Sequence, residues 1–306
     1  MKLSIIIPTY NAQEYLPKQL ERLSEQSVDF ELIIIDSSSS DRSVEIARRY
    51  TDHIIIIPQS EFDHGGTRTK AAKRASGDIV LFLTQDALPT DNYTIETIIR
   101  VFEDEKIGAV YGRQIPYEES SLFGKHLRAF NYPSTSHRRT LSDRDRYGIK
   151  TVFLSDSFAA YRVSALIDID WIKDGLISSE DSYAGAKMLL AGYDLAYEAN
   201  AQVYHSHSYS IVEEFRRYFD IGVFYNRQRW IIEKFGRAEG EGGRYIKSEL
   251  NYLIKNRAYL KIPEFFIRNG MKYIGYKLGQ NYHHLPKSIL YRATMHRSWW
   301  SKFQDI

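Results

Sequence analysis

The sequence contains no cysteine and no long apolar segment. The absence of cysteine excludes disulfide bonds, thiolate nucleophiles and cysteine-built zinc or iron–sulfur sites, and it favours a reducing compartment. Apolar runs such as Ile54–Ile57 are far shorter than the ~20 residues that a helix needs to cross a bilayer. The first residues lack a charged leader followed by an apolar stretch and a cleavage site, so we expect neither a signal peptide nor a membrane-spanning helix.

The composition is that of an ordinary globular chain, but the charge is unevenly distributed. The 306 residues are 43% hydrophobic and 26% charged, with a net charge of +2, which suits one large domain or two modest ones. Residues 213–306 hold 18 Lys and Arg against 9 Asp and Glu, whereas residues 1–212 hold 23 against 30. From 245 to 303, 11 basic residues are interleaved with 12 aromatic ones. This pattern indicates either an anionic partner, membrane or nucleic acid, or an amphipathic helical layer packed on the body.

Short β-branched runs alternate with amphipathic helical patterns through the first hundred residues. We expect strands at 3–7, 31–35, 53–57 and 79–83, and helices at 12–25, 42–50 and 66–75. Because the strands lack polar alternation, they predict a mostly parallel sheet that is covered on both faces. The fold class is therefore α/β and doubly wound, with ligands bound where the strands end.

The second half of the sequence is organised differently. Further strands are expected at 108–113 and 151–154, and a helix from Glu180 that ends before Gly192. From Ile211 the pattern is helical, with interruptions expected at the 240–243 glycine cluster, at Pro263 and at Pro286. We therefore expect a catalytic α/β domain over residues 1–210 and a helical, basic and aromatic C-terminal region over 211–306.

Two carboxylates follow predicted strands. Asp36 ends the strand at 31–35 and can accept hydrogen bonds from a ribose or a base, while Asp41 in the same loop suits a helix cap. Asp86 follows the strand at 79–83, at the edge where a divalent cation finds oxygen ligands, although an Asp in such a turn also stabilises the turn itself. A nicotinamide-dependent oxidoreductase is disfavoured, because the first strand is followed by PTYN rather than by a glycine-rich loop.

Taken in order, several segments resemble one family. The series SIIIPTYN, IIID with SSSSD, GTRTKAAKRASGD, FLTQDALP and SSED is similar to family 2 inverting glycosyltransferases of the GT-A fold, over about residues 2–207. EFDHGGTR and HSHSYS additionally resemble the bacterial rhamnosyltransferase-like branch, whose donor is dTDP-L-rhamnose. The resemblance implies a Rossmann-like, mostly parallel sheet followed by a C-terminal helical extension.

The resemblance also implies roles for individual residues in the donor site. The nucleotide pocket would be formed by Pro8, Thr9, Tyr10, Asp36, Arg68 and Gln85. Asp36 would bind the pyrimidine, and Arg68 would help to hold the diphosphate. Asp86 matches the last Asp of the family's D-x-D metal motif, whose first Asp is Thr84 here, so Mg²⁺ or Mn²⁺ would have one carboxylate from this motif.

Histidines are expected to complete the metal site. His205 and His207 would point to opposite faces of an extended chain, so only one of them could reach the cation. The family often has a histidine here that binds the metal or the diphosphate, and we expect His205 in this role rather than His207. A polar strand end at the surface is the alternative for this pair.

The remaining candidates concern the sugar and the acceptor. Glu180 and Asp181 match the family's acidic pair at a helix start, and inverting transfer needs a carboxylate that takes the proton of the acceptor hydroxyl. We expect Asp181 to be this base, with Glu180 as the second choice; in isolation the pair would only favour the helix N-terminus, with Ser178 or Ser179 as the cap. His64, which also suits a turn-stabilising role, and Asp156 are candidates for contacting the donor sugar or the acceptor.

These expectations combine into one functional hypothesis. The protein would transfer L-rhamnose to a surface polysaccharide or a lipid-linked glycan, in the cytoplasm at the inner face of the plasma membrane. Its partners would be the nucleotide sugar, the glycan acceptor and an anionic membrane that contacts the C-terminal region. A homodimer is also compatible with the aromatic tail, and no nucleic acid is expected. The alternatives are the same chemistry with a UDP-sugar (glucose, galactose or an N-acetylhexosamine) and a non-catalytic module that binds nucleotide and membrane.

Overall fold

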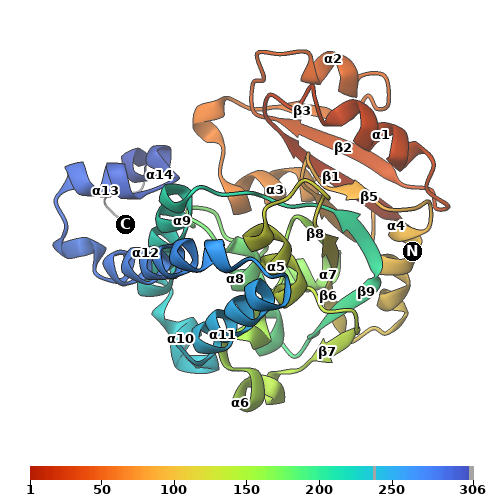
Figure 1. The fold of residues 1–306 in the computed structure, drawn as a ribbon. Helices are drawn as coiled ribbons and strands as arrows, with labels where there is room; N and C mark the ends of the chain where they lie inside the picture. Colours follow the sequence, from red (N-terminus) through yellow and green to blue (C-terminus); the bar gives the residue numbers. More distant parts are fainter. Residues whose placement is uncertain (237–238, 303–306) are drawn as a thin grey trace.

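A nine-stranded mixed sheet forms the centre of the protein, whose computed structural model describes residues 1–236 and 239–302 (Figure 1). Its strand order is β3-β2-β1-β4-β8-β6-β9-β5, and β7 pairs with β9 beside this series. The strands are β1 (Leu3–Thr9), β2 (Glu31–Asp36), β3 (Ile54–Ile56), β4 (Ile79–Leu83), β5 (Leu88–Pro89), β6 (Ile107–Ile115), β7 (His137–Arg139), β8 (Phe158–Arg162) and β9 (Asp194–Tyr204).

The N-terminal half of the sheet is parallel. Strand β1 runs parallel to both β2 and β4, and β2 runs parallel to β3. The apolar runs of β1, β2 and β4 are buried on both faces, which explains why their sequences do not alternate between apolar and polar residues. Strand β8 breaks the pattern, because it pairs antiparallel with both β4 and β6. Its N-terminal end therefore lies at the same edge as the C-terminal ends of β1, β2 and β4.

Helices cover both faces of the sheet, as the sequence predicts. The helices before the C-terminal region are α1 (Leu16–Ser24), α2 (Ser43–Ala47), α3 (His64–Ala72), α4 (Thr94–Arg100), α5 (Leu122–Asn131), α6 (Arg144–Tyr147), α7 (Val163–Asp168) and α8 (Glu180–Leu190). One core packs α1, α2 and α4 against the sheet, and a second core on the other face includes side chains of α3, α7 and α8. The doubly wound arrangement follows from these two cores.

The structure corrects the expected strand at 151–154. Residues Gly148–Val152 form a 3₁₀ helix, and the strand lies further on, in β8. A short apolar run does not distinguish the two structures by periodicity. Here the decision is tertiary, because the guanidinium of Arg139 donates hydrogen bonds to the carbonyl oxygens of Lys150 and Phe153. The predicted strand at 108–113 is confirmed within β6, and the predicted helix from Glu180 is confirmed as α8.

The C-terminal region is helical, as predicted. It consists of α9 (Ile211–Arg227), α10 (Arg229–Phe235), α11 (Glu239–Lys255), α12 (Ile262–Gln280), α13 (Lys287–Ala293) and α14 (Arg297–Lys302). The expected interruption at 240–243 is wrong, because α11 runs through these glycines. They occupy its first turns, and the apolar residues that pack this helix come later, with Leu253 fully buried. Pro263 lies in the first turn of α12 and Pro286 at the N-cap of α13, both at helix starts.

Helices α9 and α12 approach each other unusually closely, and glycines make this possible. A Cβ atom on Gly279 would overlap the carbonyl oxygen of Phe219, and one on Gly275 would overlap that of Phe215. From the other side, a Cβ on Gly222 would overlap the carbonyl oxygen of Tyr276. The backbones of α9 and α12 are therefore in direct contact, and the two helices lie side by side (Figure 1). Residues of α9 also line the cavity described next.

Candidate active site

A cavity of about 480 Å³ lies at the edge of the sheet where β4 and β9 end and β8 begins. Its lining comes from α3, the loops after β4 and β9, helix α5, the loop before β8, the start of α8, helices α9 and α12, and the loop between α13 and α14. The volume lies within the usual range for small-molecule sites, ~300–1,000 Å³. Segments that are far apart in the sequence thus converge on one site, and the C-terminal region supplies part of its wall.

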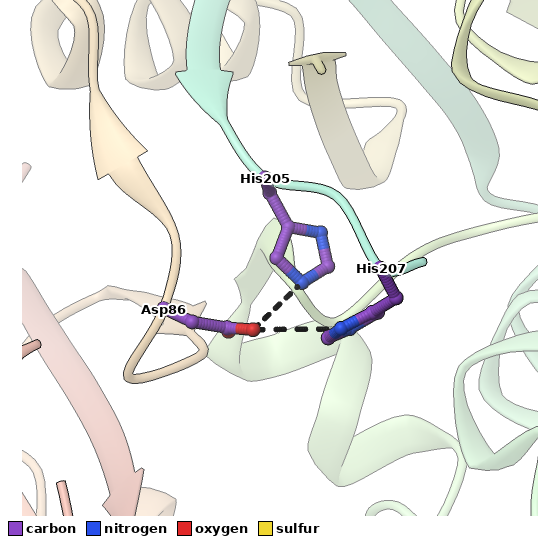
Figure 2. A group of neighbouring side chains, drawn as sticks. All are labelled: Asp86, His205 and His207. Carbon is purple, nitrogen blue, oxygen red and sulfur yellow. Dashed lines mark ion pairs between the residues drawn. The ribbon is translucent and has the colours of Figure 1, made fainter. Parts of the chain in front are cut away.

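At one end of the site, two imidazoles face a carboxylate. The Nε2 atoms of His205 and His207 lie 3.4 Å and 3.8 Å from Oδ2 of Asp86 (Figure 2). The ligand atoms of all three residues lie within 4.8 Å of one another. The expectation that only one of the two histidines reaches this point is wrong: β9 ends at Tyr204, so residues 205–207 do not continue the strand alternation.

The protonation states of this cluster suit a cation. Burial opposes ionisation of Asp86, but the contacts with His205 and His207 outweigh it, and the pKa of the carboxyl is lowered. Burial lowers the pKa of both imidazoles, to about 4 for His207, so both are neutral at pH 7. The amide oxygen of Gln114 accepts a hydrogen bond from Nδ1 of His205 at 2.8 Å. The Nε2 lone pair then faces a carboxylate oxygen, and a cation between these two acceptors fits the site.

At the other end, carboxylates surround one buried arginine. Arg68 on α3 is 5% exposed; its Nη1 lies 3.1 Å from Oε1 of Glu180, and its Nε lies 3.6 Å from Oδ2 of Asp156. His64, at the start of α3, places Nδ1 3.9 Å from Oε1 of Glu180. Asp156 lies in the loop before β8, and the hydroxyl of Tyr161 donates a hydrogen bond to it at 2.5 Å. Four residues that were singled out in the sequence therefore lie in one cluster: His64, Arg68, Asp156 and Glu180.

Neighbouring carboxyl groups in this cluster differ in acidity. Burial raises the pKa of Asp181, and the negative charges of Glu180 and Asp156 raise it further. Burial also opposes ionisation of Glu180, but His64 and Arg68 outweigh it, so the pKa of Glu180 is lowered. Two adjacent carboxyls with pKa values pushed apart are typical of an acid–base site.

The backbone before this acidic pair is strained. Ser179, at the N-cap of α8, has φ +59° in the left-handed region and makes no capping hydrogen bond with its side chain. The expected capping role of this serine is therefore not seen. A non-glycine residue in this conformation costs about 1–3 kcal/mol and is often found where a site demands it. Here it sets the direction in which Glu180 and Asp181 leave the loop.

The remaining predicted donor residues lie together near the ends of β1, β2 and β4. Asp36 is fully buried and accepts hydrogen bonds from the hydroxyls of Thr9, at 2.8 Å, and Ser39, at 2.6 Å. Gln85 Oε1 accepts a hydrogen bond from the backbone N–H of Tyr10 at 2.9 Å, which joins the loops that follow β1 and β4. Pro8, in the same end of β1, is partly buried. These residues lie outside the lining of the 480 Å³ cavity, and their role as nucleotide ligands stays a prediction.

Three residues that line the cavity were not predicted from the sequence. Arg128 on α5 donates from Nε to the carbonyl oxygen of His205 at 2.9 Å, and Arg217 on α9 lies 3.5 Å from the hydroxyl of Tyr209. No salt bridge joins either arginine to a carboxylate in residues 1–236 and 239–302. The third residue is His296, in the loop between α13 and α14. The excess of basic residues after 212 is the only sequence signal for Arg217, and it does not single out one arginine.

Comparison with known proteins identifies the class to which this fold and site belong. The sequence model described as "Glycosyl transferase family 2" matches residues 4–170. The chain belongs to this family, and the predicted GT-A fold is confirmed.

Individual relatives refine this assignment. The chain is 42% identical over 307 residues to the O-antigen chain rhamnosyltransferase RfbN of Salmonella typhimurium, covering 99% of this chain and 98% of the relative. It is equally similar, at 42%, to the O-antigen chain rhamnosyltransferase WbaN of Salmonella anatum, covering 98% and 96%. Among solved structures, a mannosyltransferase from Pyrobaculum calidifontis in complex with GDP-Man and Mn²⁺ matches with a TM-score of 0.60 at 16% identity, covering 98% of this chain and 88% of the other. The predicted resemblance to the rhamnosyltransferase-like branch is confirmed.

Proposed function

We propose that this protein is an inverting rhamnosyltransferase that moves L-rhamnose from dTDP-L-rhamnose to a hydroxyl of a surface polysaccharide or a lipid-linked glycan. The full-length similarity to two O-antigen rhamnosyltransferases supports the sugar and the class of acceptor. The observation that carries the reaction type is the cavity itself. The Asp86, His205 and His207 cluster, which is suited to a cation, borders it at one end, and carboxylates with perturbed pKa values line the other. This arrangement serves a leaving diphosphate at the first end and an attacking hydroxyl at the second.

In this reaction Asp181 is the general base. Its ionised carboxylate takes the proton of the acceptor hydroxyl, whose oxygen then bonds to the anomeric carbon of the donor. The bond between this carbon and the phosphate oxygen breaks, and its electron pair leaves with dTDP. Glu180 is less suited to the task, because its carboxylate is already paired with Arg68 at 3.1 Å. Its negative charge instead makes Asp181 a stronger base.

The diphosphate end depends on a different set of side chains. Asp86, His205 and His207 are suited to hold a divalent cation, Mg²⁺ or Mn²⁺, which when bound supplies positive charge beside the departing phosphates. Arg128 and Arg217 line the same cavity and would provide positive charge for the phosphate oxygens. Asp36 with the loops after β1 and β4 is proposed to hold the pyrimidine, as the family resemblance implies.

Titration calorimetry with dTDP, UDP, GDP and NAD⁺, each with Mn²⁺ and again with EDTA, tests the donor. Metal-assisted binding of dTDP ahead of UDP supports the rhamnosyl donor. Preference for UDP keeps the transferase and replaces the donor by a UDP-sugar. Nucleotide binding without turnover of any nucleotide sugar favours the alternative of a non-catalytic module that binds nucleotide and membrane. Binding that is unchanged by EDTA contradicts the metal assignment.

We also propose that the outer face of α12 contacts an anionic membrane, which would place the enzyme at the inner face of the plasma membrane in the cytoplasm. Its apolar residues repeat with helical spacing: Leu260, just before the helix, is 96% exposed, Phe266 63% and Tyr273 63%, with Ile267 and Ile274 beside them. A stripe of this kind, flanked by basic residues such as those at 255, 257, 261 and 277, suits the headgroup region of a bilayer. In the part of the chain that the structure describes, no helix has the length and apolarity to span a membrane.

Liposome flotation tests this surface. The unmodified protein should float with vesicles that contain anionic lipid and much less with neutral ones, and the double variant Phe266→Ser, Tyr273→Ser should remain at the bottom in both cases. The control is Ile167→Ser on α7, which removes a similarly exposed apolar side chain elsewhere (56% exposed) and should float normally. Equal recovery with neutral and anionic vesicles contradicts the electrostatic part. A stable dimer that the double variant dissociates assigns the face to a second copy of the chain instead.

A further inference from the structure

The loop between α13 and α14 is held at the cavity by a buried carboxylate. Asp220 on α9 is 1% exposed, and its Oδ1 accepts a hydrogen bond from the hydroxyl of Thr294 at 2.6 Å. Its Oδ2 accepts one from the backbone N–H of Met295 at 2.9 Å. The hydroxyl oxygen of Thr294 in turn accepts from the backbone N–H of His296 at 2.9 Å. Three consecutive residues between α13 and α14 are thus fixed by one aspartate.

Helix α14 anchors the other side of this loop. Trp299 and Trp300 are buried, and the indole N–H of Trp299 donates to the carbonyl oxygen of Gly175 at 3.0 Å. Gly175 precedes the strained turn that starts α8, and its N–H donates to Asp63, the N-cap of α3, at 3.1 Å. Helix α14 is therefore linked through Gly175 to both elements that carry the acid–base cluster.

This anchoring brings His296 to the carboxylate end of the cavity. Its ring lies 4.9 Å from the ring of His64, with an interplanar angle of 86°. Burial and the neighbouring His64 lower the pKa of His296 to about 3, and burial also lowers the pKa of His64. Both rings are therefore neutral at pH 7, and each carries one N–H donor and one acceptor nitrogen.

Neutral imidazoles beside ionised carboxylates do not suit a phosphate. The cationic groups Arg128 and Arg217 and the cluster around Asp86 are the groups proposed above for the diphosphate. A neutral imidazole, with one donor and one acceptor nitrogen, suits a hydroxyl group, which also donates and accepts hydrogen bonds. We propose that His296, positioned by Asp220, hydrogen-bonds a hydroxyl of a pyranose in the active site and contributes to the choice of sugar. This inference rests on the proposed glycosyltransferase reaction.

Two substitutions separate hydrogen bonding from packing at this position. His296→Asn keeps a donor and an acceptor but loses the ring, whereas His296→Phe keeps the ring contact with His64 and loses both polar atoms. If His296 binds a hydroxyl, the Phe variant should lose roughly two- to tenfold in sugar affinity, the effect of one neutral hydrogen bond, and the Asn variant should retain most of it. His283→Ala, an exposed histidine in the turn before α13, is the control and should behave as the unmodified protein.

The two possible sources of the hydroxyl are distinguished by the ligand. If it belongs to the donor, His296→Phe weakens calorimetric binding of dTDP-L-rhamnose but not of dTDP. If it belongs to the acceptor, donor binding and slow hydrolysis of the donor by water are unchanged, and KM rises for p-nitrophenyl hexosides used as acceptor probes. Asp220→Asn, which loses one acceptor of the clamp, should move the same parameter in the same direction while the protein remains folded by thermal melting.

The result that overturns the inference is equally definite. If His296→Phe matches the unmodified protein in donor affinity, kcat and acceptor KM, or if Phe is tolerated and Asn is not, the histidine only fills space. This outcome is separate from failure of the proposed function, in which the unmodified protein itself turns over no nucleotide sugar.

Discussion

The pH dependence of catalysis should reveal the unusual basicity of Asp181. Burial and the charges of Glu180 and Asp156 raise the pKa of Asp181 to about 8, against about 3.9 for an exposed aspartate. A general base acts only when it is ionised, and kcat/KM reports the free enzyme. Below its pKa the ionised fraction falls tenfold per pH unit, so kcat/KM at pH 6 should be roughly one hundredth of the plateau above pH 9.

The assay is release of dTDP from dTDP-L-rhamnose between pH 5.5 and 9.5, at saturating Mn²⁺ and constant ionic strength. Glu180→Gln removes the adjacent negative charge and should move the midpoint to lower pH, whereas Asp181→Asn should abolish transfer at every pH and leave dTDP binding nearly intact. A profile that is flat from pH 6 to 9, or an active Asp181→Asn variant, would refute the assignment.

The raised pKa of Asp181 also predicts that this catalytic group lowers the stability of the folded protein at high pH. A carboxyl whose pKa is raised by folding favours the folded state fully below its unfolded pKa of about 3.9, and this contribution is lost as the pH rises toward the folded value. Asp181→Asn carries no charge to bury. Its melting temperature should therefore exceed that of the unmodified protein at pH 8 by more than it does at pH 4.

Three further predictions concern other parts of the molecule. Asp86→Ala should weaken dTDP binding at least tenfold in Mn²⁺ and change it little in EDTA, as measured by calorimetry, because it removes the only carboxylate of the metal cluster found in the described residues. Arg217→Gln should weaken dTDP binding with or without metal, and equal affinity for the variant and the unmodified protein contradicts a phosphate contact. Gly279→Ala should lower the melting temperature, because the new methyl overlaps a backbone oxygen of α9 at a cost of about 1–3 kcal/mol or more. Gly270→Ala in the same helix meets nothing within 4 Å and should melt at the same temperature or slightly higher.

The core strands of the sheet could be predicted because their signal is local. Runs such as Ile33–Ile35 are β-branched and apolar on every residue, and this composition has one stable placement, a strand buried on both faces. The antiparallel strand β8 carries a weaker signal, because FAAYR is rich in small residues and follows a more apolar run that becomes a 3₁₀ helix. Either of these two neighbouring segments could pair with β4. The pairing depends on the fit to the rest of the sheet, which neither segment reveals by its own sequence.

Part of the site could also be predicted, because several of its residues lie in segments with a recognisable local sequence. Asp86, Arg68, Glu180 and Asp181 lie in segments whose order along the chain resembles the family. The structure places Arg68, Glu180 and Asp181 in the lining of one cavity, and Asp86 contacts two histidines of the same lining. His207 was expected to point away, because alternation was extended past Tyr204, where the strand in fact ends. Beyond the end of a strand, the two-residue alternation no longer determines which way a side chain points.

The sequence by itself determined the alternating α/β pattern, the strand-end carboxylates and the helical character of residues 211–236 and 239–302. These depend on composition and on contacts between near neighbours, which a linear sequence displays. Only the tertiary structure decided that Asp220 holds Thr294 and so brings His296 beside His64, across more than 200 positions of the chain. It also decided that Asp181 rather than Glu180 is the stronger base, since their difference arises from the burial and charges that surround them in space. Contacts of this range leave no periodicity in the sequence, because each residue meets its partner only after the whole chain has packed.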